Sequence, residues 1–180
     1  MTLSSDPIAV RLFHFSEDPG ILRFEPHVLA TNPDEPPLVW AISEAHMPHY
    51  LFPRDCPRVC FWPGPETTRE DRERFFTGVS ARKVIAIESA WLDSVRGAKL
   101  YQYEIPPERF TLRDRFAGYF VSRTAVVPKS VEPAGDLLSR LAASGVELRF
   151  VPSLLPLRDR LVASTVEFSM IRLRNASQAP

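Results

Sequence analysis

A histidine and a serine share one face of the first strand that the sequence predicts. Val10–Ser16 reads V-R-L-F-H-F-S, so that His14 and Ser16 alternate with Phe13 and Phe15. An imidazole in such a position can orient a ribose or a phosphate by hydrogen bonding, or act as a general base. The alternative is a half-buried histidine bonded to a backbone carbonyl, since a polar group on a buried face needs a partner in any case. His14 is therefore a candidate catalytic residue and Ser16 a candidate binding residue.

The densest collection of reactive side chains lies in residues 39–62, V-W-A-I-S-E-A-H-M-P-H-Y-L-F-P-R-D-C-P-R-V-C-F-W. His46, His49, Cys56 and Cys60 are residue types that bind zinc, but the spacing H-x2-H-x6-C-x3-C matches no common zinc site. No metal site is predicted. Cys60 falls inside an apolar run and is expected in the core. His46 remains a candidate substrate-binding residue.

The cluster R-D-C-P-R at residues 54–58 has two interpretations. Two guanidinium groups near one carboxylate commonly form an ion-pair cluster that fixes a loop. Alternatively, Arg54 is free to bind a phosphate or a carboxylate of a ligand. Tyr50 precedes the cluster by one short turn and could stack on a flat ligand. The sequence therefore predicts Tyr50 and Arg54 as binding residues of an anionic ligand.

A late carboxylate, Glu167, is the second candidate catalytic residue, and Arg172 and Asn175 near the C-terminus are candidate binding residues. Their segment, residues 157–175, is ambiguous because apolar residues recur both at spacings of three and four and in alternation. Its length favours a helix.

The elements that position these residues are short and separated by prolines, of which the chain has 18 in 180 residues. Predicted strands cover residues 10–16, 38–42, 59–62, 83–88, 99–105, 119–127 and 146–151. Predicted helices cover residues 48–52, 67–76, 90–95 and 133–144. Without a regular βαβ rhythm, this pattern favours one loop-rich α+β domain over residues 1–180, with a mostly antiparallel, bent sheet and a few peripheral helices. Residues 1–8 are expected to form a loose terminus.

Composition excludes several classes of function. The formal net charge is zero, so neither nucleic acid nor a membrane surface is an expected partner. No apolar run is long enough for a transmembrane helix, and no export signal precedes the first strand, so a cytoplasmic location is expected. Neither Gly-rich nucleotide-binding fingerprint occurs, which disfavours a Rossmann domain and a P-loop NTPase. The sequence does not predict an oligomeric state.

Several of these segments resemble a family of uncharacterised bacterial proteins. The shared pattern is L-F-H-F-S-E-D-P-G-I at 12–21, V-W-A-I at 39–42, H-M-P-H-Y-L-F-P-R-D-C-P-R-V at 46–59 and F-S-M-I-R-L-R-N-A at 168–176. The family implies no activity.

A more distant likeness is to ADP-ribosyltransferase-like folds. L-F-H-F-S with His14 resembles their first strand, V-W-A-I followed by Tyr50 resembles their second element, and Glu167 would be their late glutamate. This resemblance implies NAD as a cofactor, with His14 orienting the ribose and Glu167 stabilising an oxocarbenium ion. It also implies that Glu167 lies on a strand, which conflicts with a helix over residues 157–175.

The leading hypothesis is one cleft, lined by His14, Ser16, His46, Tyr50, Arg54 and residues 172–175, that binds a nucleotide-like or other small anion. If the protein is an enzyme, ADP-ribosyl-type transfer is the expected reaction. The alternatives are a non-enzymatic binding or interaction protein, in which these side chains only order loops, and a metal-dependent hydrolase that uses the histidines.

Overall fold

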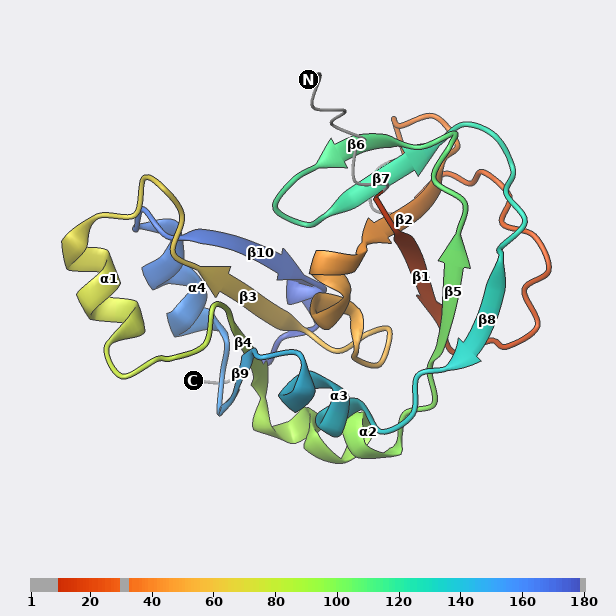
Figure 1. The fold of residues 1–180 in the computed structure, drawn as a ribbon. Coiled ribbons are helices and arrows are strands. Elements are labelled where there is room, and N and C mark those ends of the chain that lie inside the picture. Colours follow the sequence, from red (N-terminus) through yellow and green to blue (C-terminus); the bar gives the residue numbers. More distant parts are fainter. Residues whose placement is uncertain (1–9, 30–32, 179–180) are drawn as a thin grey trace, which may run out of the picture.

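The computed structural model describes residues 10–29 and 33–178, and the fold is α+β with mostly antiparallel strands (Figure 1). Its strands form a six-stranded sheet in the order β6-β7-β2-β1-β5-β8 and a four-stranded sheet in the order β10-β3-β4-β9. The predicted fold class is confirmed, although the strands form two sheets.

The six-stranded sheet is antiparallel throughout. Its members are β1 (Leu12–Ser16), β2 (Val39–Ser43), β5 (Tyr101–Ile105), β6 (Thr111–Asp114), β7 (Tyr119–Ser122) and β8 (Ser130–Pro133). Strand β1 is central and pairs with β2 on one side and with β5 on the other, placing His14 opposite Tyr103. The first predicted strand therefore lies in the interior of the sheet.

The four-stranded sheet is covered on both faces. Its members are β3 (Arg58–Trp62), β4 (Val84–Glu88), β9 (Glu147–Val151) and β10 (Glu167–Ile171), and only β4 and β9 pair in parallel. Side chains of β3 and β4 alternate between two cores, because successive strand residues point to opposite faces. Cys60 and Ile85 belong to the core that α2 and α3 cover, whereas Phe61 and Val84 belong to the core that includes residues of α1 and α4.

The helices are short. They are α1 (Arg69–Phe76), α2 (Leu92–Gly97), α3 (Leu137–Ala143) and α4 (Leu155–Val162), with 3-10 helices η1 (Glu44–Tyr50), η2 (Ser89–Trp91) and η3 (Leu173–Asn175). Side-chain oxygens of Thr68 and Asp136 cap α1 and α3 at their N-termini. No described helix is long and apolar enough to cross a membrane.

Helix η1 joins the two sheets, since it follows β2 and precedes β3 (Figure 1). The sequence predicted a helical segment from Pro48 to Phe52, with Pro48 in its first position. That boundary was wrong: the 3-10 helix begins at Glu44, and Pro48 lies inside it. The chain needs this segment to pass from one sheet to the other, so η1 brings His46 and Tyr50 between the sheets.

The preference for a helix over residues 157–175 was wrong for its C-terminal half. Helix α4 ends at Val162, where the Ser164 hydroxyl donates to the carbonyl of Leu161, and Thr165 binds the carboxylate of Asp71. These polar side chains compete with the helical hydrogen bonds. Strand β10 then pairs with β3 over five residues, so Glu167 lies on a strand opposite Trp62.

The sequence did not predict β6 or β8, whereas α4 (Leu155–Val162) lies largely within the N-terminal part of the helix preferred for residues 157–175. All residues of β6 and β8 are exposed, so these strands carry no alternation of apolar and polar residues. The expected loose terminus at residues 1–8 lies outside the described residues.

Candidate functional site

One pocket of the described chain lies between β1, β2, the segment that follows η1 and the C-terminal segment that includes η3. Its volume is about 670 Å³, which is within the usual range for small-molecule sites. Residues 13–17, 40–42 and 170–172 contribute most of its strand walls. We call it the arginine pocket, because four arginines line it.

The arginine pocket carries an excess of positive charge. Arg54, Arg58, Arg172 and Arg174 line it together with one carboxylate, Glu17. The Oε1 atom of Glu17 accepts a hydrogen bond from the backbone N–H of Arg54 at 3.1 Å. Within residues 10–29 and 33–178, none of the four guanidinium groups forms an ion pair. Such a lining favours an anionic ligand.

Arg58 is the buried member of this group, with 4% of its surface exposed. Its Nε donates to the carbonyl of His49 at 2.5 Å, and one terminal nitrogen donates to the carbonyl of Cys56 at 2.8 Å. The guanidinium also lies over the rings of Tyr50 and Phe52. The ion-pair cluster expected for residues 54–58 is therefore not formed, because Arg58 uses backbone carbonyls in place of a carboxylate.

Arg172 has an unusual backbone. Its φ of 55° and ψ of 26° lie in the left-handed region, and it is the only described non-glycine residue with a positive φ. A side chain with a Cβ costs about 1–2 kcal/mol there. Strained residues of this kind concentrate at ligand sites. The turn directs the chain from β10 into η3, and Arg172 lines the pocket at that turn.

Aromatic residues form much of the remaining wall. His14 Nδ1 lies 3.0 Å from the carbonyl oxygen of Trp40, so the neutral ring donates from Nδ1 and keeps Nε2 as an acceptor. Burial lowers the pKa of His14, which favours that neutral form. Burial also raises the pKa of Tyr50, whose hydroxyl donates to the carbonyl of Ala117 at 3.1 Å. Trp40 Nε1 is buried without a hydrogen-bond partner among the described residues.

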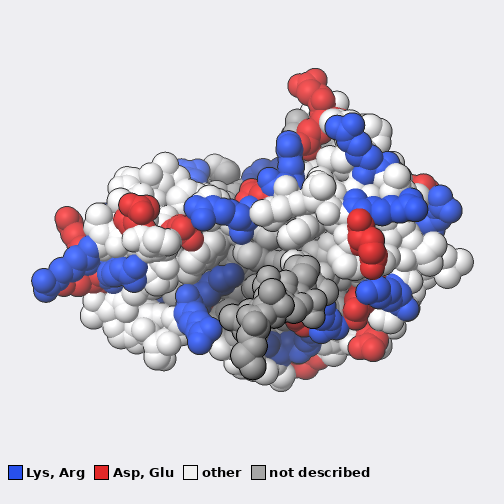
Figure 2. All heavy atoms as spheres, turned by 45° about the horizontal axis from the view of Figure 1, so that its top comes forward, with Lys and Arg blue, Asp and Glu red and all other residues white. Residues whose placement is uncertain are grey.

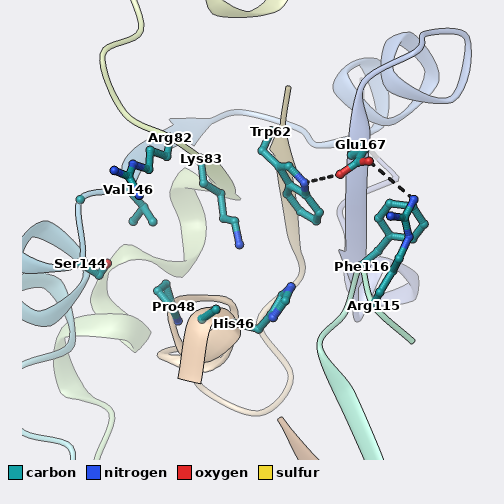
Figure 3. Close-up of a pocket in the computed structure, with 12 residues that line it drawn as sticks. His46, Pro48, Trp62, Arg82, Lys83, Arg115, Phe116, Ser144, Val146 and Glu167 are labelled. Atoms are coloured by element: carbon teal, nitrogen blue, oxygen red, sulfur yellow. Dashed lines mark hydrogen bonds and ion pairs between the residues drawn. The ribbon is translucent and has the colours of Figure 1, made fainter. Parts of the chain in front are cut away.

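The second pocket lies on the other side of η1 and has a volume of about 520 Å³ (Figure 3). We call it the lysine pocket, because Lys83 extends into the space between Trp62 and η1. Lys83 Nζ lies 2.7 Å from His49 Nε2 and 4.6 Å from the centroid of the Trp62 ring. No described residue lines both pockets.

Two side chains of the lysine pocket are seated against glycines. The ring of His46 packs on Gly118, where a Cβ would lie 2.2 Å from the ring, and Glu167 packs on Gly64 in the same way. Glu167 accepts from Trp62 Nε1 at 2.7 Å and faces Arg115 at 3.7 Å (Figure 3). Burial and the nearby Lys83 lower the pKa of His46 to about 4, so its ring is neutral at pH 7.

His49 lies between the two pockets and is completely buried. Its Nε2 accepts from Lys83 of the lysine pocket, and its backbone carbonyl accepts from Arg58 of the arginine pocket. Burial, followed by the charge of Lys83, holds the pKa of His49 well below its usual value. A neutral imidazole thus separates two cationic side chains.

Other kinds of site find less support. Over the part of the surface that is visible beside the grey atoms in Figure 2, Lys and Arg side chains are interspersed with Asp and Glu. That face therefore shows no large surface of one charge. Among the described residues, no group of three or more His, Cys, Asp or Glu side chains could hold a metal ion.

Comparison with known proteins shows a family but no activity. The chain matches a family of unknown function, DUF6886, over residues 13–176. The chain belongs to DUF6886. No curated protein and no solved structure matches it. The resemblance to an uncharacterised family is thus supported, whereas the likeness to ADP-ribosyltransferase-like folds is not.

The candidate residues of this DUF6886 chain do not line one cleft. The arginine pocket contains five of them, and the lysine pocket contains His46 and Glu167. The five are His14, Ser16, Tyr50, Arg54 and Arg172. The expected single cleft is therefore wrong, because η1 and its buried His49 stand between the two groups. Asn175 lines neither pocket, and its side-chain amide donates to the carbonyl of Asp55 at 2.8 Å.

The sequence did not indicate Arg58 as a pocket residue, although it placed Arg174 in the cleft with residues 172–175, and it did not indicate Lys83, Trp62 or Arg115 as binding residues. Lys83 directly precedes the apolar run V-I-A-I of β4, and a charged residue next to a buried strand is a usable signal. Arg115 lies in an exposed loop whose sequence carries no comparable pattern.

Proposed function

We propose that this DUF6886 protein binds a nucleotide-like anionic small molecule in the arginine pocket. One observation carries the proposal: four arginines line the pocket, and none of them has an ion-pair partner within the described part of the chain. A phosphate or carboxylate supplies the missing partner through charge-assisted hydrogen bonds.

The rest of the wall suits the flat, less polar part of such a ligand. Rings of His14, Trp40, Tyr50 and Tyr119 line the pocket. The Nε2 atom of His14 is left to accept a hydrogen bond from a ribose hydroxyl, because Nδ1 is used by Trp40.

The proposal is limited to binding. The transfer reaction implied by the likeness to ADP-ribosyltransferases needs His14 and Glu167 to contact one NAD molecule. These residues line different pockets, and Glu167 already binds Trp62 and Arg115. NAD is accordingly retained as a candidate ligand, and no catalytic step is assigned.

The test is calorimetric titration with ADP and NAD, and with adenosine as the neutral control. We expect ADP to bind at least about tenfold more tightly than adenosine, since each lost charged hydrogen bond costs about 1.5–3 kcal/mol. Arg54→Gln should weaken ADP binding, whereas Arg69→Gln, on the exposed face of α1, should not. Absence of binding at millimolar ADP and NAD would contradict the proposal.

The same variants decide between this proposal and the purely structural alternative. If the arginines only order loops, Arg54→Gln lowers the melting temperature and no nucleotide binds. If the proposal is right, Arg54→Gln leaves the melting temperature of the free protein nearly unchanged, because Arg54 is exposed and makes no described side-chain ion pair.

A further inference from the structure

The lysine pocket contains an ammonium group with unused hydrogen-bonding capacity. Lys83 has three N–H donors, and the described contacts of its nitrogen are His49 Nε2 and the face of Trp62. Both of these partners are neutral. No carboxylate of residues 10–29 or 33–178 lies within ion-pair distance of Lys83, although the side chain is partly buried.

The charges around Lys83 do not neutralise it. Arg82 and Arg115 also line the pocket, and Glu167 is the one acidic residue among the described residues of that lining. The carboxylate of Glu167 is engaged by the indole N–H of Trp62 and by Arg115. His46 is neutral at pH 7 because its pKa is about 4. The lining therefore holds three cations and one anion, and the excess charge is positive.

The wall of the pocket is aromatic as well as cationic. The rings of Trp62 and Phe116 lie 6.4 Å apart at an angle of 37°, and both line the pocket. Because Lys83 lies over the Trp62 ring, a ligand bound to its ammonium group is close to that ring as well (Figure 3). An inorganic anion would leave these rings uncovered, whereas a flat organic anion contacts both features.

We propose that the lysine pocket is a second binding site, independent of the arginine pocket, for a small aromatic carboxylate. The carboxylate accepts hydrogen bonds from Lys83, and the aromatic ring packs against Trp62 and Phe116. The site is rigid on the protein side. Trp62 lies on β3. Glu167 packs directly against Gly64 and His46 against Gly118, and a larger residue at either glycine would displace these side chains.

The test uses benzoate as the probe, with benzamide as its neutral counterpart of the same shape and inorganic phosphate as a non-aromatic anion. We expect wild-type protein to bind benzoate at least about tenfold more tightly than benzamide or phosphate, since only benzoate offers both charge and ring. Equal affinity for benzoate and benzamide, or phosphate binding as tight as benzoate binding, overturns the proposal.

Variants locate the site. Lys83→Met keeps the alkyl chain and removes the charge, so benzoate binding should fall by about tenfold or more, and Lys83→Arg should retain part of it. Arg172→Gly changes the arginine pocket alone and should leave benzoate affinity unchanged, which separates this proposal from the proposed nucleotide site. Benzoate affinity that survives in Lys83→Met, or is lost in Arg172→Gly, overturns the proposal.

A measurement on wild-type protein covers the case in which Lys83→Met does not fold, since that variant leaves His49 Nε2 without its donor. The chain has three tryptophans, so a nitrogen-15 correlation spectrum should contain three indole N–H signals. Benzoate should shift the Trp62 signal, identified by its loss in Trp62→Phe. A shift confined to Trp40 or Trp91, or no shift at all, contradicts the proposal.

Discussion

Arg172→Gly should raise the stability of the protein and lower its affinity for an anionic ligand. Glycine adopts a φ of 55° without the cost of about 1–2 kcal/mol that a Cβ imposes. Its greater freedom in the unfolded chain offsets about 0.5–1 kcal/mol of that gain. We therefore expect the variant to be more stable by about 0.5–1 kcal/mol, or about 1–4 °C in melting temperature for a chain of this size.

The same variant removes one guanidinium from the arginine pocket. If Arg172 binds the anionic group of the ligand, the loss of a charged hydrogen bond of about 1.5–3 kcal/mol weakens ADP binding by about 10- to 100-fold. Arg174→Gly is the matched control for the backbone, because Arg174 lines the same pocket with a negative φ and should lose about 0.5–1 kcal/mol of stability. Thermal and urea unfolding measure the stabilities, and calorimetry measures the affinity. An Arg172→Gly protein that is less stable than wild type, or that binds ADP as tightly as wild type does, would contradict this prediction.

Three further predictions concern the rest of the structure. The pKa of His46 is about 4 in the folded state and about 6.5 in the unfolded chain, so the unfolded chain takes up a proton first as the pH falls. Lowering the pH from 8 to 5 should therefore cost the wild-type protein about 1–2 kcal/mol of stability, and His46→Asn should not show this loss. Urea titrations of both proteins at both pH values check this, and an equal pH dependence of the two would contradict it. Gly118→Ala should cost at least about 2 kcal/mol, because the new methyl group meets the His46 ring, whereas Gly78→Ala, also at positive φ but in open space, should cost about 1 kcal/mol in the same unfolding assay. Burial raises the pKa of both Cys56 and Cys60 to about 12, so neither thiol should react with a disulfide reagent at pH 8 until the protein is unfolded, and rapid labelling of the native protein would be the contrary result.

The sequence was sufficient for those elements that carry a continuous apolar run or a periodic pattern of apolar residues. Strands β1, β4 and β5 and helix α3 lie within the ranges that periodicity predicted. Strands β6 and β8 are fully exposed and are held by backbone pairing with β7 and β5, which no local pattern records. The pairing of β10 with β3 likewise overrode the helical spacing of residues 157–175.

The candidate site was predicted in part for a similar reason. His14, Tyr50, Arg54 and Arg172 line one pocket, as the leading hypothesis required, although they come from three separate segments. The assignment of His46 and Glu167 to the same cleft was wrong because it depended on which side of η1 each residue faces. That side is set by long-range contacts, the packing of His46 on Gly118 and of Glu167 on Gly64, which single-sequence spacing cannot show.

The most direct test of the central claim is a crystal structure of the protein with ADP. We expect the phosphates to lie against Arg54 and Arg172 in the arginine pocket and the base to contact the rings around Tyr50. Two results would contradict this expectation. One is ADP bound in the lysine pocket. The other is an arginine pocket that stays empty in crystals grown with millimolar ADP, when ADP is bound elsewhere on the protein.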